Sequence, residues 1–174
     1  VPYHRLVAEL FLYPALYRQA CDLTVPEPYR ERVAAMARFT AAYSRCDGSS
    51  PLWGDADDGR ALAFGTQALN DHRYLIGASA SGLQKPELTS LCSGPRDELA
   101  WLLGLAAAVD LPARGEPERA ISQAFRRGGF YVMRAGRHHV FVDCGPLGLA
   151  GRGGHGHNDL LSFELMLDGV HLFS

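Results

Sequence analysis

Two histidines in a glycine-rich segment are the residues of this sequence best suited to chemistry. Residues 151–159 read GRGGHGHND, which places His155 and His157 two positions apart. In extended chain, side chains at i and i+2 project to one side, and the flanking glycines let a ligand or a second backbone approach closely. Imidazoles carry protons or bind metal ions near neutral pH. A surface loop with two solvated histidines is the alternative, and the spacing alone leaves both interpretations open.

Several known motifs do not fit this segment. A phosphate-binding P-loop needs Gly-Lys-Ser/Thr, and the segment has no lysine. A zincin needs HExxH on a helix, and a dinucleotide-binding loop leads into a helix, whereas β-rich residues follow here. A small metal-dependent barrel enzyme of the cupin type uses HxH with a nearby glutamate. Glu164 comes late for that pattern, so this hypothesis is the weaker one.

Charged residues elsewhere are candidates for ligand contacts. Residues 54–60 read GDADDGR, and a calcium loop is disfavoured because Thr66 stands where a late glutamate is needed. Helix capping or pairing with Arg60 is the favoured interpretation of these aspartates. Arg134 lies in a basic cluster that could bind carboxylates or sulfates, or that could be a solvated turn. Arg152 is a better candidate because it neighbours His155.

The first part of the chain has helical periodicity. An apolar stripe at i, i+3, i+4, i+7 and i+8 predicts a packing face for the first helix, and it consists of Tyr3, Leu6, Val7, Leu10 and Phe11. Pro14 should bend or end that helix. A second helix is predicted from about residue 27, with an apolar face formed by Tyr29, Val33, Met36, Ala37 and Tyr43. Further helices are predicted over about 62–80 and 96–108. The loop between them, residues 46–60, is rich in Gly, Asp and Ser.

The second part has β periodicity. Residues 130–134 and 139–143 form a predicted hairpin, and Asp168-Gly169 is a turn signal between two later strands. Phe163 and Leu165 alternate with Glu164 and are predicted to face the core. Helices followed by strands indicate an α+β protein with more than one domain. The predicted domains are 1–112 and 113–174, with a Pro/Gly-rich boundary.

Composition excludes several classes of protein. The 174 residues are 47% hydrophobic and 21% charged, with a net charge of −2, which excludes intrinsic disorder and a basic nucleic-acid-binding surface. No apolar run reaches the roughly 18 residues needed to span a bilayer. Four widely spaced cysteines do not suggest a zinc site and leave open whether they pair. Without an initiator Met and with a strand at its end, the chain is expected to be part of a longer protein.

A family resemblance rests on the residues just described. The run GRGGHGHNDLLSFELMLDGVHLF, with GGFYVMRAGRHHVFVDCGPLG before it, closely resembles the start of the β-domain of heparinase II/III-like polysaccharide lyases. Residues 3–10 resemble a helix of that family's α-toroid, and residues 54–60 resemble a loop of its bacterial members. The resemblance implies helices from the C-terminal part of an incomplete (α/α) toroid, followed by the first strands of an antiparallel β-sandwich.

The resemblance also implies a reaction and roles for residues. The reaction is β-elimination at a uronic acid of an acidic polysaccharide, with stabilisation of the developing carboxylate charge and a tyrosine as base and acid. Tyr3 matches the catalytic tyrosine, although its place on the apolar stripe equally suits packing. His155 matches the substrate-facing histidine, and His157 matches a ligand of a structural zinc. Candidate substrate-binding residues are His4, Arg134 and Arg152.

Other features of the resemblance lie outside the sequence. The Asn-His pair that neutralises the carboxylate is expected before Val1, and the next zinc ligand at or just after Ser174. The alternative function is a non-catalytic carbohydrate-binding or exopolysaccharide-assembly protein on the same scaffold. The resemblance implies a periplasmic, cell-envelope or secreted location and no nucleic-acid partner.

Overall fold

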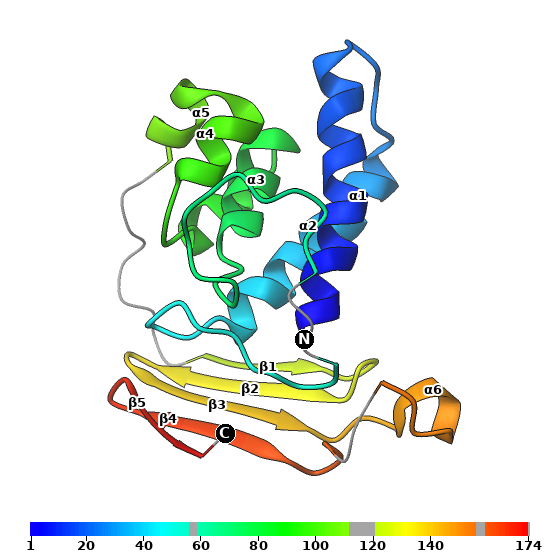
Figure 1. The fold of residues 1–174 in the computed structure, drawn as a ribbon, viewed down its shortest axis with the longest axis vertical. Coiled ribbons are helices and arrows are strands. Elements are labelled where there is room, and N and C mark those ends of the chain that lie inside the picture. The colour runs from blue at the N-terminus through cyan, green and yellow to red at the C-terminus, as the bar shows by residue number, and fades with distance from the viewer. Residues whose placement is uncertain (56–58, 112–120, 156–158, 174) are drawn as a thin grey trace.

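A computed structural model describes residues 1–55, 59–111, 121–155 and 159–173, and it stacks a group of helices on one face of an antiparallel sheet (Figure 1). The helices are α1 (Pro2–Ala20), α2 (Glu27–Tyr43), α3 (Tyr74–Gly82), the 3-10 helix η1 (Pro86–Leu91), α4 (Asp97–Leu103), α5 (Leu105–Val109) and α6 (Gly148–Gly151). The strands are β1 (Ile121–Phe125), β2 (Phe130–Ala135), β3 (His138–Asp143), β4 (Phe163–Leu167) and β5 (Val170–Phe173). This order confirms the predicted α+β class. The predicted boundary at 112–113 adjoins residues 112–120, which are outside the described ranges.

Helix α1 buries a different face from the predicted one. Its buried residues are Pro2, Arg5, Ala8, Glu9, Leu12, Ala15 and Leu16, whereas Val7, Leu10 and Phe11 are exposed. The expected apolar packing stripe is therefore wrong for these three residues. Arg5 and Glu9 belong to the buried face because residues outside the helix form hydrogen bonds and an ion pair with them. The helix also continues through Pro14.

A buried ionic network fixes the loop before α3 to the helices. The Arg60 guanidinium lies between two fully buried carboxylates, with Nε 3.1 Å from Glu9 Oε1 and Nη2 2.5 Å from Glu98 Oε1. It also lies 4.5 Å from the centre of the Tyr74 ring. Arg5 donates to the carbonyl oxygens of Leu69 and Gly59. Arg60 thus pairs with glutamates on α1 and α4. Asp57 and Asp58, two of the three aspartates expected to cap a helix or to pair with Arg60, lie outside the described residues.

Helix α2 confirms its predicted start and face, while two other helices differ from prediction. Val33, Ala37 and Tyr43 of α2 are buried. Residues 62–73 contain no helix, and α3 begins only at Tyr74. The predicted helix over 96–108 is broken at Gly104, whose φ of 88° is incompatible with a continuous helix.

The sheet is an antiparallel meander of strand order β1-β2-β3-β4-β5. Both predicted turns are present, and Asp168 and Gly169 have φ values of 48° and 78°, the positive pair that a type I′ hairpin requires. Strand β1 was not predicted, and it pairs with β2 from Ile121↔Arg134 to Phe125↔Phe130. The long connection between β3 and β4 contains α6 and the glycine-rich segment.

Strand β4 is turned the opposite way from prediction. Glu164 and Met166 are buried toward the helices, whereas Phe163 is 50% exposed and Leu165 is only partly buried. The Glu164 carboxylate is paired with the Arg45 guanidinium, and both side chains are 5% exposed. This buried ion pair allows a charged residue to take the covered face.

The sheet contacts the helices through an aromatic cluster at the base of α2. Phe141 is fully buried, and its ring centre lies 4.8 Å from that of Trp53 and 5.3 Å from that of Phe130. Phe39 of α2 packs against the same group. The imidazole of His139 bonds the Ala42 carbonyl at 3.0 Å. Apolar packing and buried hydrogen bonds therefore hold the two units together.

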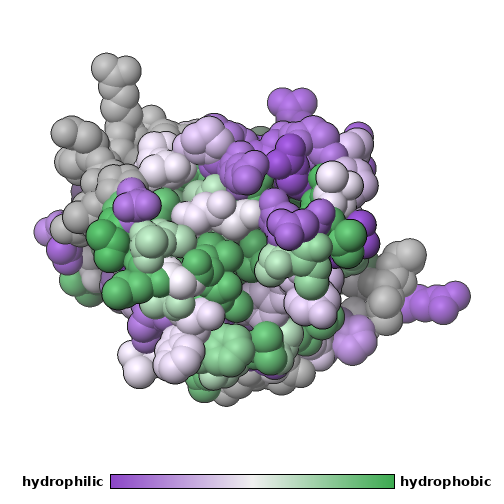
Figure 2. All heavy atoms as spheres, turned by 90° about the horizontal axis from the view of Figure 1, so that it is seen from above, coloured by the Kyte–Doolittle hydropathy of each residue, from purple (hydrophilic) through white to green (hydrophobic). Residues whose placement is uncertain are grey.

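Apolar side chains also reach the surface. On the side of the helices away from the sheet they include Trp101, Leu105 and Val109, and Figure 2 shows apolar patches there among polar residues. On the sheet they include Tyr131, Met133, Phe163, Val170 and Leu172. None of the helices in the described ranges has the length and hydropathy to cross a membrane. The four cysteines are free thiols.

Candidate functional site

A cleft lies where the N-terminal end of α1 meets the sheet and the loops that follow β3. Its volume is about 240 Å³. The residues that line it come from α1, the loop after α2, the turn between β1 and β2, and the β3–β4 connection, and they include Tyr3, Trp53, Gly54, Asp55, Phe130, Asp143, His155 and Asp159. Segments from both ends of the chain thus form one cavity.

Tyr3 and His155 face each other across this cleft. Their ring centres are 6.0 Å apart and the rings meet edge to face at 75°. Tyr3 is partly buried, so its hydroxyl-bearing ring is not part of the helical core. His155 has a φ of 61°, the left-handed region that non-glycine residues seldom adopt and that often marks functional sites. The two residues predicted to be catalytic are therefore brought together.

Three carboxylates line the cleft together with His155, and one of them contacts its imidazole. Nδ1 contacts Asp55 Oδ2, and Asp159 Oδ2 accepts a 2.7 Å bond from the Gly54 N–H. Asp143 Oδ1 accepts a 2.7 Å bond from the Gly145 N–H, and burial raises the pKa of the Asp143 carboxyl above its usual value. Asp143 and Asp159 had no role in the sequence-based predictions, because nothing in their spacing indicates that the long β3–β4 connection folds back onto the cleft.

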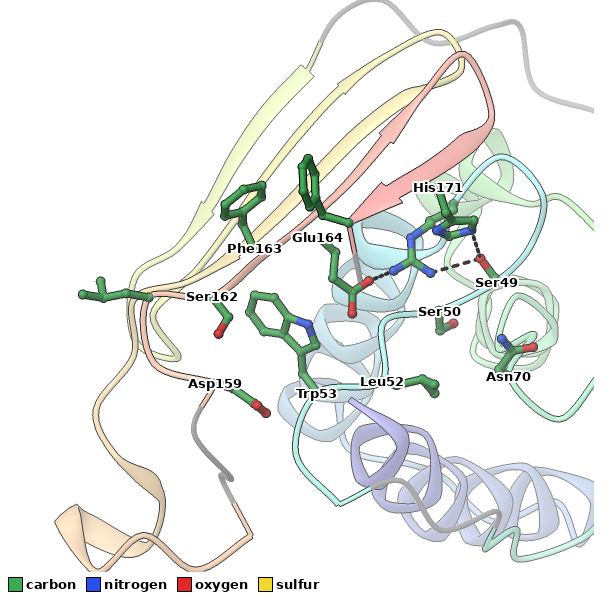
Figure 3. Close-up of a pocket in the computed structure, with 13 residues that line it drawn as sticks. Ser49, Ser50, Leu52, Trp53, Asn70, Asp159, Ser162, Phe163, Glu164 and His171 are labelled. Atoms are coloured by element: carbon green, nitrogen blue, oxygen red, sulfur yellow. Dashed lines mark hydrogen bonds and ion pairs between the residues drawn. The ribbon is translucent and has the colours of Figure 1, made fainter.

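A larger cavity of about 780 Å³ adjoins the cleft and shares Trp53 and Asp159 with it. Figure 3 shows Asp159 and Ser162 on one side of this cavity, Ser49 and Asn70 on the other, and Trp53 between them. Several of its polar side chains already have partners. Arg45 pairs with Glu164, and the His171 imidazole lies 3.2 Å from Asp47 Oδ2. The cleft of Tyr3 and His155 is therefore the stronger candidate site.

The second part of the chain is similar to a known protein family. Residues 117–174 match the family model described as heparinase II/III-like, C-terminal. No curated protein sequence is significantly similar to the chain.

Two solved structures share the fold of nearly the whole chain. A heparan sulfate lyase HepC mutant from Pedobacter heparinus matches 97% of the chain with a TM-score of 0.63 and 20% identity. A heparinase III with methylated lysines matches 85% of the chain with a TM-score of 0.53 and 21% identity. The chain corresponds to 23% and 19% of those two proteins. The helices and the heparinase II/III-like strands therefore have the spatial arrangement found in those lyases.

His4 does not reach the cleft, although it is adjacent to Tyr3 in sequence. Its Nε2 lies 3.1 Å from the Met36 carbonyl oxygen and 3.3 Å from Thr40 Oγ1. Burial between α1 and α2 lowers the pKa of His4 to about 4. The structure thus places this candidate substrate-binding residue among helix contacts.

The two candidate arginines differ in their surroundings. Arg134 Nη1 donates a 2.7 Å bond to the Ala41 carbonyl at the end of α2, so this side chain joins the sheet to the helices. Arg152 is exposed in the glycine-rich segment, three residues before His155. Of the two, Arg152 is the one whose position leaves it accessible to an anionic ligand.

The predicted structural zinc has His157 as its ligand in this sequence. His157 lies outside the described residues. Within the described ranges no three His, Cys, Asp or Glu side chains form a group able to hold a metal ion. The structural zinc stays a prediction from the family resemblance.

Proposed function

We propose that this chain forms part of a polysaccharide lyase that cleaves a uronate-containing polysaccharide by β-elimination. The observation that carries the proposal is the approach of Tyr3 and His155 to 6.0 Å between ring centres, across a cleft between the helices and the sheet. Both residues are those that the heparinase II/III resemblance selects. The fold shared with two heparin or heparan sulfate lyases supports the same reaction class.

The reaction requires removal of a weakly acidic proton from C5 of the uronic acid. In the proposed mechanism Tyr3 reacts as the phenolate: its oxygen takes this proton, the bond from C4 to the leaving oxygen breaks, and a C4–C5 double bond forms. The departing oxygen then receives a proton from Tyr3, which balances the charge. General acid–base groups of this kind contribute on the order of 10²–10⁴-fold in rate.

His155 has the complementary role of meeting the substrate carboxylate. Loss of the C5 proton places negative charge on the carboxylate group, and a hydrogen-bond donor aimed at that charge stabilises the transition state. His155 is 63% exposed at its side chain and lies on the cleft lining. Asp55, Asp143 and Asp159 on the same lining disfavour an anion, so we expect Arg152 and His155 to contribute the positive counterpart.

The test is to incubate the full-length protein with a panel of uronate polymers that includes heparan sulfate, a second glycosaminoglycan and alginate. A lyase generates 4,5-unsaturated products, which absorb in the ultraviolet and lack the added water of a hydrolytic product in mass spectra. Binding without any unsaturated product would favour the carbohydrate-binding alternative. The resemblance further leads us to expect such a protein in the periplasm or cell envelope, where its polymers occur.

A further inference from the structure

Two carboxylate–imidazole pairs connect the loop after α2 to the sheet side of the molecule. Asp55 contacts His155 at the cleft, and Asp47 contacts His171 of β5 at 3.2 Å. Both aspartates belong to the same loop, but only the first pair includes a residue on the lining of the Tyr3 cleft. The second pair offers an internal comparison for the first.

Backbone contacts reinforce the first pair. The Asp55 N–H donates to the His155 carbonyl at 3.3 Å, and the Gly54 N–H donates to Asp159 Oδ2 at 2.7 Å. The approach is so close that a Cβ at Gly54 would lie 2.8 Å from the His155 carbonyl oxygen. Residues 54–55 therefore fit against the segment that contains His155 through main chain as well as side chain.

The loop that presents Asp55 is anchored just before it. Trp53 is 7% exposed and packs edge to face on the buried Phe141. The packing of Trp53 therefore holds the backbone two residues before Asp55 against the sheet. The His155 ring is itself mostly exposed, and its contacts within the described ranges are the Tyr3 ring and Asp55.

We propose that Asp55 is a positioning residue: its carboxylate accepts the His155 Nδ1 proton, and in the doubly protonated ring this contact aims the Nε2–H at the substrate carboxylate. A carboxylate on one ring nitrogen fixes the tautomer and the ring orientation, and at metal-binding histidines the loss of such a partner costs on the order of 10- to 100-fold in affinity or activity. The inference rests on the proposed function, since it assigns the role of Asp55 in that same reaction.

The experiment compares D55A with D47A in the full-length protein, using the uronate polymer that the wild type cleaves. We expect D55A to lower kcat by about 10- to 100-fold with KM changed less than about threefold, and D47A to leave both near wild type. In ¹⁵N spectra of histidine-labelled protein above neutral pH, His155 should have its proton on Nδ1. D55A should shift this signal toward the Nε2-protonated form, and D47A should not.

Each outcome decides the proposal. An unchanged His155 tautomer in D55A, or an equal loss of kcat in D47A, overturns it. If D55A does not fold, D55N retains the size of the side chain, and an unchanged kcat in D55N would also overturn it. If the wild type cleaves no polymer, the lyase function fails, but the ring-nitrogen signals still test the Asp55 contact independently.

Discussion

Tyr3 and His155 are far apart in the sequence, and they meet because α1 begins beside the sheet at the cleft. The glycine-rich segment brings His155 back with a positive φ, and Gly54 allows the opposing loop to approach it without a side chain in between. At the scale of single residues, the arrangement thus depends on backbone conformations that few side chains tolerate.

Gly54→Ala should disturb the site through this close approach. Gly54 has a φ of 69°, so alanine there costs roughly 1–2 kcal/mol in backbone strain, and its Cβ would displace the His155 carbonyl. We expect lyase activity to fall along with the free energy of unfolding. Gly136→Ala is the matched control, because Gly136 has a φ of 55° and open space around an added Cβ. A similar loss of activity in both variants would contradict the account.

At the scale of elements, the loop before α3 is held by charge rather than by apolar packing. Arg60 is 7% exposed and lies between Glu9 of α1 and Glu98 of α4. Removing one partner from a buried ion pair leaves uncompensated charge in a place of low dielectric constant. The network therefore connects three parts of the helical unit.

Arg60→Ala should lower the free energy of unfolding by about 3–5 kcal/mol, because Glu9 and Glu98 would remain buried without their cation. Arg38→Ala is the control. Arg38 is 40% exposed and pairs with Glu31 and Glu87, so we expect a loss below about 1 kcal/mol. Urea denaturation of both variants measures the difference. Equal effects would show that the Arg60 network is not a principal source of stability.

Local signals decide which features of the helices and strands could be predicted from the sequence. The α2 face and both β-turns were predictable, because periodicity and turn residues are local signals. The buried face of α1 was not, since Arg5 and Glu9 are acceptable inside only when partners from residues 59–69 are present. The alternation of apolar and polar residues in β4 predicts two faces, but it does not indicate which face is covered. Glu164 lies on the covered face because it pairs with Arg45 there.

The site was predictable only in part, for a related reason. The types and spacing of Tyr3 and His155 suggested their roles through the family resemblance. Their proximity, and the contact of Asp55 with His155, depend on how α1 and the β3–β4 connection pack on the sheet. His4 shows the converse, because helix geometry turns it away from its neighbour Tyr3 and into the contact with α2.

At the scale of the whole molecule, three buried histidines make stability depend on pH. Burial lowers the pKa of His4 to about 4, of His72 to about 3 and of His139 to about 4. In the unfolded chain each would titrate near its ordinary value of about 6.5. Below that pH the unfolded state binds more protons than the folded state, so stability falls as the pH decreases toward 4.

Between pH 7 and pH 5 each of these histidines should reduce the free energy of unfolding by about 2 kcal/mol. His139→Gln keeps a donor for the Ala42 carbonyl without a titratable group, so it should make the pH dependence shallower by about that amount. Urea denaturation at the two pH values is the measurement. An identical pH dependence in the variant and the wild type would show that His139 is protonated equally in both states.

The exposed apolar faces predict how the 174-residue chain behaves alone. Phe163 and Leu172 are about half exposed on the sheet, and contiguous apolar surface promotes association. We expect concentration-dependent self-association and binding of an apolar dye, both reduced in the Phe163→Ser, Leu172→Ser double variant. Leu23→Ser, at a half-exposed position in the loop after α1, should change neither. A monomeric chain with a sharp cooperative unfolding transition would contradict this expectation.

If Tyr3 performs acid–base catalysis in a lyase reaction, the loss of its phenolic oxygen alone should slow that reaction. Tyr3→Phe removes only the phenolic oxygen, while Tyr17→Phe makes the same change at an exposed position of the same helix. The rate of unsaturated product formation from a uronate polymer should fall by about 10²–10⁴-fold in Tyr3→Phe and stay near wild type in Tyr17→Phe. Product formation by Tyr3→Phe at the wild-type rate would contradict the account.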